Sequence, residues 1–269
     1  MNGMAEPLRA VITGAQGRMG RAILHLLGED ETIKPVQLID RDGSFEPGAM
    51  IGVGRWDAIE LRGDLSHVPF DVLIDFSAPE ASLQFLEACA TAQKPMVIGT
   101  TGFTDEEQAL ITAKAMDIPI MQASNYSLGV ALLTRLVGLA SATLGDQADI
   151  EIVEMHHRRK VDAPSGTALS LLEAVRAQLS QEASLVDGRS GLVGPRSEDE
   201  IGMHAIRGGD VVGEHSVIFA LEGERLELTH RASKRTNFAQ GAVAAAKWLS
   251  AQSTAGLYGM EHLIVNLDV

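Results

Sequence analysis

Cysteine is nearly absent from this sequence, which has one, Cys89, among 269 residues. A single thiol cannot form an internal disulfide, so the class of small secreted domains held together by several disulfides is excluded. Cys89 lies in EASLQFLEACATA, an amphipathic helical pattern, and a buried cysteine packs like a small apolar side chain. We therefore expect Cys89 to lie in a core and to take no part in catalysis.

Long apolar runs and positive charge are also scarce. No segment approaches the roughly 20 continuous apolar residues that a membrane helix needs, and the N-terminal MNGMAEPLRAVITGAQG lacks the cationic and apolar regions of a secretory signal. Lys and Arg number 22 against 36 Asp and Glu, a formal net charge of -14 that repels phosphate backbones. The sequence therefore predicts a cytoplasmic protein with neither a membrane nor a nucleic acid as partner.

What the sequence does contain is an alternation of short apolar segments with helical patterns. Strands are expected at residues 8–15, 34–40, 71–77, 95–102 and 118–124, and helices at 18–29, 80–92 and 105–116. Such alternation is typical of βαβ units and a parallel sheet. Residues 41–66 are richer in glycine and polar side chains, with only IELRG as a weak strand, so the order of the sheet there stays open.

The character of the sequence changes after a strongly apolar helical pattern at residues 128–145. We expect a strand, a helix and a long loop, then three strands of which the last two form a hairpin around EGE, at residues 148–157, 165–179, 181–200, 201–209, 214–221 and 225–232. An Ala-rich helix at 237–252 closes the chain and could pack on either domain, and the change of pattern before it favours the first domain.

The expected fold class is α/β, with two domains. Residues 1–127 and 236–269 would form a Rossmann-type dinucleotide-binding domain. Residues 128–235 would form a second, smaller α+β domain for substrate binding and assembly.

A glycine-rich turn follows the first expected strand and opens the first helix. Gly14, Gly17 and Gly20 allow a tight turn and close approach of the backbone to a pyrophosphate, while the helix N-terminus adds free N–H groups and a positive dipole. The spacing GxxGxxG is weak as a bare pattern, and a purely structural turn is the alternative. In its strand-to-helix context, the turn predicts a site for NADH and/or NADPH formed by Gly14, Ala15, Gln16, Gly17, Arg18 and Met19.

Asp40 stands about 20 residues after the turn, at the end of the second strand, as the dinucleotide fingerprint requires. Its carboxylate would accept hydrogen bonds from the adenosine ribose, which favours NADH, whereas Arg41 would pair with the 2′-phosphate of NADPH. The two residues therefore predict use of both cofactors, and the alternative is an exposed charged pair with no ligand.

Two further loops follow later strands of the same expected sheet. Ligands of open α/β sheets bind outside the carboxyl ends of the strands, so both loops would face the cofactor. Loops rich in Gly, Thr, Ser and Asn are also common without any ligand. The residues expected to contact the nicotinamide half are Gly99, Thr100 and Thr101, and Ala123, Ser124, Asn125 and Tyr126.

Ionisable and hydrogen-bonding side chains are most concentrated in EMHHRRKVDAPSGTA, from Glu154 to Ala168. Ser165 is expected to cap a helix, so that the amides after it point outward at the helix N-terminus. With Lys160 and Arg159 nearby, the segment predicts a cradle for a carboxylate or a phosphate. A histidine beside this cradle, across from a hydride donor, is expected to transfer a proton, because imidazole titrates near neutral pH.

A metal site is the alternative interpretation of the paired histidines. Neighbouring strand residues point to opposite faces, and the sequence has no HExxH motif or Cys/His metal spacing. We therefore expect no metal.

On these motifs the sequence resembles the 4-hydroxy-tetrahydrodipicolinate reductase (dihydrodipicolinate reductase) family of the diaminopimelate route to lysine. The family pattern ExHHxxKxDxPSGTA is met in full from Glu154 to Ala168. The resemblance extends to the Gly14–Gly20 turn, VIGTTGF, ASNYSLGV, RGGDVVGEH and LTHRASKRTNFAQGA, and so covers nearly the whole chain.

The resemblance implies roles for individual residues. His156 matches the family's proton donor or acceptor, and Lys160 matches its second proton donor and partner of a substrate carboxylate. The matching substrate contacts are His157, Gly166 and Thr167. The nucleotide contacts match the turn and loops named above, with Tyr126 where many relatives have Phe.

The resemblance also implies an activity and an assembly. The reaction would be NAD(P)H-dependent reduction of a cyclic imine dicarboxylate, dihydrodipicolinate, to tetrahydrodipicolinate. The family is typically a homotetramer assembled through the sheet of the second domain. Two alternatives are another two-domain dehydrogenase, such as an aspartate or homoserine dehydrogenase, and a regulator that binds NAD(P)H without turnover. The HHxxKxDxPSGTA run argues against both.

Overall fold

A computed structural model describes residues 6–66 and 68–264 of the chain. The chain forms two compact units, each with its own sheet and its own core. The first unit runs to Ser127 and resumes at Thr236, and the second is Leu128–Arg235. Within the described residues, no helix is both long and apolar enough to cross a membrane.

The first unit is built on a sheet with the strand order β13-β7-β6-β5-β1-β2-β4-β3. Its strands are β1 (Leu8–Thr13), β2 (Ile33–Ile39), β3 (Met50–Val53), β4 (Trp56–Arg62), β5 (Val72–Asp75), β6 (Met96–Ile98), β7 (Pro119–Gln122) and β13 (Gly256–Tyr258). Neighbouring strands are parallel except for the pair β3 and β4. This parallel sheet confirms the expected α/β, Rossmann-type fold, and it brings the carboxyl ends of its parallel strands to one edge.

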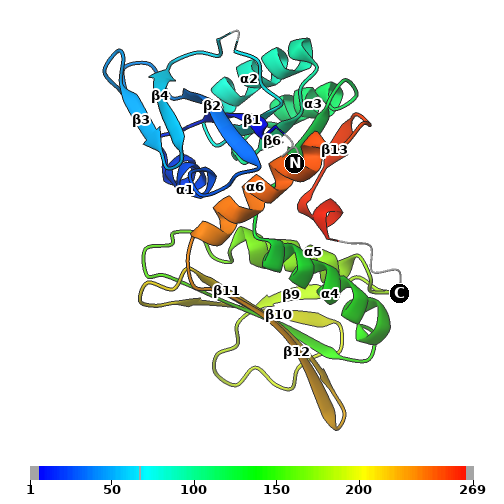
Figure 1. Cartoon of the computed structure of the whole chain (residues 1–269). Helices are drawn as coiled ribbons and strands as arrows, with labels where there is room; N and C mark the ends of the chain where they lie inside the picture. The colour runs from blue at the N-terminus through cyan, green and yellow to red at the C-terminus, as the bar shows by residue number, and fades with distance from the viewer. Residues whose placement is uncertain (1–5, 67, 265–269) are drawn as a thin grey trace, which may run out of the picture. The chain divides into compact units, whose positions relative to one another are not determined.

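Helices pack on this sheet in two pairs (Figure 1). The first pair is α1 (Arg18–Leu27) with α6 (Thr236–Ser250), and the second is α2 (Pro79–Ala92) with α3 (Asp105–Lys114). Cys89 of α2 is fully buried against α3 and the sheet, which confirms its expected place in a core. In α6, a Cβ on Gly241 would lie 1.6 Å from the carbonyl oxygen of Tyr126, so this glycine lets the closing helix approach the end of β7.

The segment left open by the sequence, residues 41–66, contains the strands β3 and β4. They pair antiparallel, with Gly54 at a positive φ in the turn between them. β4 then continues the main sheet beside β2, with Leu38 opposite Leu61. IELRG is therefore the inner strand of a hairpin.

The second unit holds a sheet in the order β12-β11-β8-β10-β9, covered on one face by two helices (Figure 1). The helices are α4 (Leu128–Leu144) and α5 (Gly166–Arg176), and the strands are β8 (Asp149–His156), β9 (Ser184–Asp187), β10 (Glu200–Arg207), β11 (Gly213–Leu221) and β12 (Glu224–Ala232). β11 and β12 form the expected hairpin. Alternate residues of β8 are buried on the helix side, namely Ile150, Ile152, Glu154 and His156.

Two expectations for the ends of the sheets were wrong. The segment 181–200 is not all loop, because Ser184–Asp187 forms β9 and pairs in parallel with β10. The chain after α6 also adds β13, which pairs with β7. Both strands are only three or four residues long, so their alternation was too short to distinguish them from loop.

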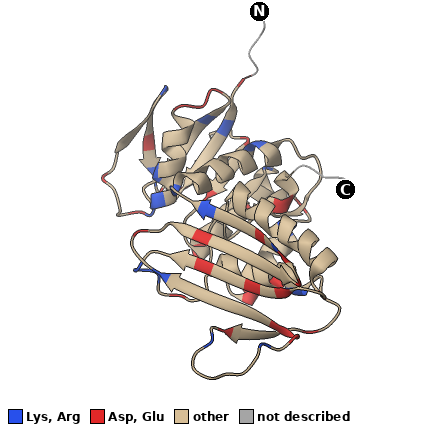
Figure 2. Cartoon of the chain, turned by 90° about the horizontal axis from the view of Figure 1, so that it is seen from below, with Lys and Arg blue, Asp and Glu red and all other residues tan. Residues whose placement is uncertain are grey.

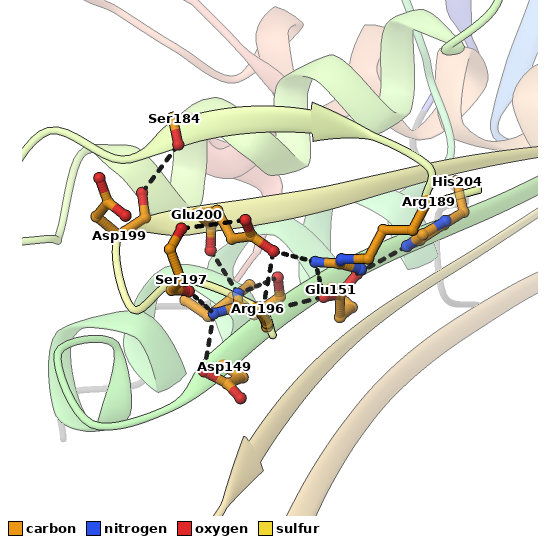
Figure 3. Close-up of polar contacts among 10 residues, drawn as sticks. Asp149, Glu151, Ser184, Arg189, Arg196, Ser197, Asp199, Glu200 and His204 are labelled. Carbon is orange, nitrogen blue, oxygen red and sulfur yellow. Dashed lines mark hydrogen bonds and ion pairs between the residues drawn. The ribbon is translucent and has the colours of Figure 1, made fainter. Parts of the chain in front are cut away.

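The open face of the second sheet carries a charged network (Figure 3). Glu151 of β8 accepts hydrogen bonds from Arg189 at 2.9 Å, Arg196 at 3.2 Å and His204 at 2.7 Å. Gly202 leaves room for it, since a Cβ there would lie 1.7 Å from the Glu151 carboxylate. The network ties the loop between β9 and β10 to the sheet, whose strands carry several acidic positions (Figure 2).

Candidate active site

In the first unit, the glycine turn has a shape that only glycine allows. Gly14 has a φ of +65°, and a Cβ on it would lie 2.1 Å from the carbonyl oxygen of Phe76. A Cβ on Gly20 would lie 2.2 Å from the carbonyl oxygen of Gly14. α1 begins directly after Gly17, with no capping side chain and no acidic residue in its first turn. The first N–H groups of α1 are therefore left for a ligand, and the dipole of the helix favours an anion there.

A cavity of about 710 Å³ lies beside this turn, within the first unit. Its wall includes Gly14 and Gly17, then Asp40 and Arg41 at the end of β2, and the first turns of α2. Size and position fit the adenosine half of a dinucleotide whose pyrophosphate rests on α1. The remaining charged side chains of the wall are Asp42, Asp64 and Glu80, so the cavity is mainly acidic.

A buried hydroxyl network holds the neighbouring loops in place. Asp75, at the end of β5, is fully buried and accepts hydrogen bonds from Thr13, from Ser77 at 2.5 Å and from Thr100 at 2.7 Å. Thr100 Oγ1 also accepts from the backbone N–H of Ser77 at 2.9 Å. The Thr100 hydroxyl is therefore committed to the protein, and Asp75, through Thr13 and Thr100, fastens the ends of the adjacent strands β1, β5 and β6 to one another.

Two other predicted cofactor residues are also engaged internally. Tyr126 is 2% exposed, its hydroxyl donates to the carbonyl of Ile98 at 2.8 Å, and its ring packs edge-on against Phe76. Burial raises the pKa of Tyr126 well above its usual value. Ala15 is fully buried, and its N–H donates to the carbonyl of Ile39. Neither side chain lines the cavity, so at these two residues a ligand would meet only the backbone.

The remaining predicted cofactor residues lie together at one edge of the first sheet. They follow β1, β2, β6 and β7, which with β5 are consecutive strands of that sheet. The exposed or partly exposed members are Gln16, Arg18, Met19, Asp40, Arg41, Gly99, Thr101, Ala123, Ser124 and Asn125.

In the second unit, Glu154 is the centre of a buried polar cluster. It is fully buried, and it accepts hydrogen bonds from His156 Nδ1 at 2.6 Å and from the backbone N–H of Ser165 at 3.0 Å. Arg207, at the end of β10, adds two parallel hydrogen bonds of 2.8 Å. Burial opposes ionisation of Glu154, but these donors outweigh it and hold the pKa of Glu154 below its usual value.

His156 ends β8 with its two ring nitrogens in different surroundings. Because a carboxylate only accepts hydrogen bonds, Nδ1 carries the proton that faces Glu154, and Nε2 is the nitrogen that points away from this carboxylate. Nε2 faces Gly213, where a Cβ would lie 3.1 Å away. The ring of His215 packs edge-on against that of His156, with centroids 5.1 Å apart. Burial, together with the charge of His156, lowers the pKa of His215 to about 4.

The predicted cradle forms at the start of α5. Ser165 caps the helix as expected, since its Oγ accepts from the backbone N–H of Ala168 at 3.2 Å. Its Oγ also lies 3.0 Å from Nε2 of His215. Gly166 and Thr167 form the first turn of α5, and no acidic residue stands there. The N-terminus of α5 is thus arranged to receive an anion.

Two cationic side chains near the cradle, Lys160 and Arg235, have partners in this structure. Lys160 lies 2.9 Å from Asp162, and this ion pair lowers the pKa of Asp162. Arg235 donates to Nε2 of His157 at 3.1 Å. Partial burial and the charge of Arg235 lower the pKa of His157.

Sequence reasoning missed four residues of this cluster: Glu154, Arg207, His215 and Arg235. Arg207 and His215 lie in RGGDVVGEH, and Arg235 lies in LTHRASKRTNFAQGA. Both segments belong to the resemblance to the family, but the sequence alone indicates no role for these side chains. Among the described residues, no group of three or more His, Cys, Asp or Glu side chains is arranged to hold a metal ion.

Comparison with known proteins covers the whole fold. The family model described as "Dihydrodipicolinate reductase, N-terminus" matches residues 8–126, and "Dihydrodipicolinate reductase, C-terminus" matches residues 129–264. The 4-hydroxy-tetrahydrodipicolinate reductase of Pseudomonas fluorescens (strain SBW25) is 47% identical over 265 residues, which is 95% of this chain and 98% of that protein.

Solved structures are similar at lower sequence identity. Dipicolinate-bound dihydrodipicolinate reductase from Paenisporosarcina sp. TG-14 aligns with a TM-score of 0.76 at 24% identity, covering 94% of this chain and 97% of that one. The amine dehydrogenase of Mycobacterium smegmatis aligns with a TM-score of 0.62 at 14% identity, covering 94% and 95%. These two likenesses show a shared fold.

Proposed function

This chain belongs to the dihydrodipicolinate reductase family, and on that basis we propose that it reduces dihydrodipicolinate, which forms from 4-hydroxy-tetrahydrodipicolinate by loss of water, to tetrahydrodipicolinate. The reaction belongs to lysine biosynthesis by the diaminopimelate pathway. The observation that carries the proposal is the cluster around Glu154, which sets a proton-transferring histidine beside a helix N-terminus able to hold a carboxylate.

The reductant is a nicotinamide dinucleotide, NADH and/or NADPH, which supplies a hydride to the substrate ring. The glycine turn and the first turn of α1 would hold the pyrophosphate, and Asp40 and Arg41 would contact the adenosine ribose. The nicotinamide half would rest on the loops after β6 and β7, through Gly99 to Thr101 and the backbone of Ala123 to Tyr126. The side chains of Thr100 and Tyr126 serve instead to fix these loops, and Ala15 does so through its backbone N–H.

The substrate is a small cyclic imine with two carboxylates. One carboxylate would sit on the amides of Gly166 and Thr167 with Lys160 as its charged partner, and His157 would contact the substrate from the preceding loop. Lys160 then exchanges Asp162 for the substrate. His156 would deliver a proton from Nε2 to the enamine carbon that the reduction leaves.

We also infer that the enzyme acts in the cytoplasm as a homotetramer, with neither a membrane nor a nucleic acid as partner. Support for the assembly comes from the open face of the second sheet. Val153, Met155, Ile206 and Ile218 lie on that face by the register of β8, β10 and β11, and Ile206 is 46% exposed. These apolar side chains share the face with the charged network around Glu151, and a second copy of the chain would shield them from water.

The activity is tested by following the loss of reduced-nicotinamide absorbance while the cyclic imine is made in situ from pyruvate and aspartate semialdehyde. Oxidation of the cofactor is expected only when both precursors and the condensing enzyme are present. The matched control is His156→Ala, which keeps the nucleotide loops. A folded protein that binds NADH but oxidises none of it would refute the proposal and favour a non-catalytic NAD(P)H-binding regulator.

A further inference from the structure

The cluster contains two charged residues, Glu154 and Arg207, for which the proposed reaction needs no direct contact with substrate. Both are on the helix-covered side of the sheet with His156, because Glu154 lies two residues before His156 on β8 and Arg207 pairs in register with His156. Glu154 is fully buried, and both of its oxygens are saturated by four donors. A buried charge that is so fully satisfied holds its neighbours in one arrangement.

We propose that Glu154 and Arg207 act as one positioning pair that sets the pH at which His156 releases its proton. This inference rests on the proposed function only in naming His156 as the proton donor. Glu154 alone would hold the imidazolium strongly, because an ionised carboxylate 2.6 Å from Nδ1 stabilises the charged ring. Arg207 shares the same carboxylate, so imidazolium and guanidinium compete for it, and His156 can lose its proton again.

Charge counting within the cluster leads to the same conclusion. With neutral His156, the charges of Glu154 and Arg207 cancel, whereas the imidazolium leaves one net positive charge among buried groups. The other titratable groups close to His156 are His215 on β11, and His157 and Lys160 in the loop that follows β8. His215 is neutral at the pH of catalysis, since burial lowers its pKa to about 4.

The pair also holds the loop that carries Lys160. Arg207 donates to the carbonyl of Asp162 at 2.6 Å, and Glu154 accepts from the N–H of Ser165. One end of the loop follows His156, and the other end begins α5. Loss of either member would therefore disturb the cradle as well as the histidine, so the test must separate geometry from charge.

Three variants separate these effects: Glu154→Gln, Arg207→Gln and Arg207→Lys. Removal of the carboxylate destabilises the imidazolium, so Glu154→Gln should move the His156 titration to lower pH by about one unit or more. Arg207→Gln removes the competing cation and should move it to higher pH by about one unit. Arg207→Lys keeps the charge, so the His156 titration in this variant should stay near that of wild type. Arg225→Gln, on the exposed edge strand β12, is the matched control and should change nothing.

The measurement is the NMR titration of the histidine ring signals in the free protein, with His156 identified by its absence from the spectrum of His156→Gln. The basic limb of the pH profile of kcat should move in the same directions.

Shifts in the same direction in Glu154→Gln and Arg207→Gln, or no shift in either, would overturn the proposal and leave the pair a purely structural role. If Glu154→Gln does not fold, Arg207→Gln and Arg207→Lys decide the question alone, because a structural role predicts no difference between their titrations. Absence of reductase activity with opposite shifts intact would refute the proposed function and leave this inference standing.

Discussion

Asp40, after the end of β2, accepts a hydrogen bond from the backbone N–H of Gln16, with 2.7 Å between Oδ2 and the nitrogen. Its other oxygen accepts from the N–H of Arg41 at 2.8 Å. The carboxylate therefore ties the glycine turn to the second strand. Ser44 Oγ donates to the same oxygen as the N–H of Arg41, at 3.5 Å. Since an ionised carboxylate has about four lone-pair sites, one is left for a ribose hydroxyl. Asp40 thus has a structural role in addition to the cofactor contact predicted from its position.

The first prediction concerns the choice between NADH and NADPH. Arg41 is the only cationic side chain that the described residues place in the cavity wall, against Asp40, Asp42, Asp64 and Glu80. Arg41→Ala should therefore weaken the binding of NADPH by about tenfold and the binding of NADH much less, because only NADPH carries the 2′-phosphate. Fluorescence titration of both cofactors measures the difference.

Asp42→Asn is the complementary change to the same wall. The carboxylate of Asp42 rests against Gly63, where a Cβ would lie 1.6 Å from its Oδ1. Loss of this negative charge should strengthen the binding of NADPH relative to that of NADH. Arg62→Ala, on β4 and paired with Glu60, serves as the control. Equal losses of both cofactors in Arg41→Ala would show that Arg41 does not contact the 2′-phosphate.

A second prediction tests the open side of His156. Gly213→Ala would place a methyl group 3.1 Å from Nε2, tighter than an ordinary contact, at the atom that exchanges the proton. We expect kcat to fall while the protein folds and NADH binds as in wild type. Gly138→Ala in α4, where a Cβ meets nothing within 4 Å, is the control and should raise stability by about 0.5–1 kcal/mol. Unchanged kcat in Gly213→Ala would place the proton path elsewhere.

The sequence predicts most of the fold because its elements are strongly patterned. In β8, for example, the alternation of residues from Ile150 to His156 predicts both the strand and its buried face. Ser165 could be recognised as a helix cap because its environment is local. β9 and β13 could not be predicted, because each depends on pairing with a distant strand.

The active-site cluster was only partly predictable for the same reason. Glu154 and Arg207 are 53 residues apart, and only the parallel pairing of β8 with β10 brings them together. The position of Tyr126 in its loop predicts a contact with the cofactor, whereas its hydroxyl donates a hydrogen bond to the carbonyl of Ile98 inside the core. A sequence motif shows which residue types are close in the chain, whereas burial and partners depend on neighbouring strands.

A third prediction concerns stability at mildly acid pH. The folded-state pKa of His215, lowered by burial to about 4, is below its usual value of 6.5, so the unfolded chain binds the proton more tightly. His215 therefore contributes stability that is full above about pH 6.5 and is lost as the pH falls toward 4. Between pH 7 and 5 the loss is about 2 kcal/mol.

The measurement compares unfolding midpoints at pH 7 and 5 for wild type and His215→Gln. The midpoint of the variant should fall less between the two pH values, because glutamine does not titrate. His25→Gln, an exposed position on α1, should behave like wild type. An identical pH dependence in wild type and His215→Gln would mean that His215 is not the group that titrates.

The last prediction distinguishes proton transfer by His156 from carboxylate binding by Lys160. His156→Ala should lower kcat by about 10²–10⁴-fold, because it removes the general acid, while substrate affinity stays nearly intact. Lys160→Ala should raise KM as well as lower kcat, since the substrate carboxylate loses its charged partner and keeps only the amides at the start of α5. Arg158→Ala, in the same loop and exposed, is a matched control for loss of a cation and should change neither constant as much.

NADH binding distinguishes these local effects from damage to the rest of the protein. Among the residues that the structure describes, those that line the proposed nucleotide cavity all belong to the first unit, whereas His156 and Lys160 belong to the second. Fluorescence titration should therefore give the same NADH affinity in wild type and in both variants. Full activity in His156→Ala would remove that residue from the mechanism. Lost NADH affinity in either variant would mean that the cofactor depends on residues outside the first unit, so that the separation of cofactor and substrate roles between the two units is wrong.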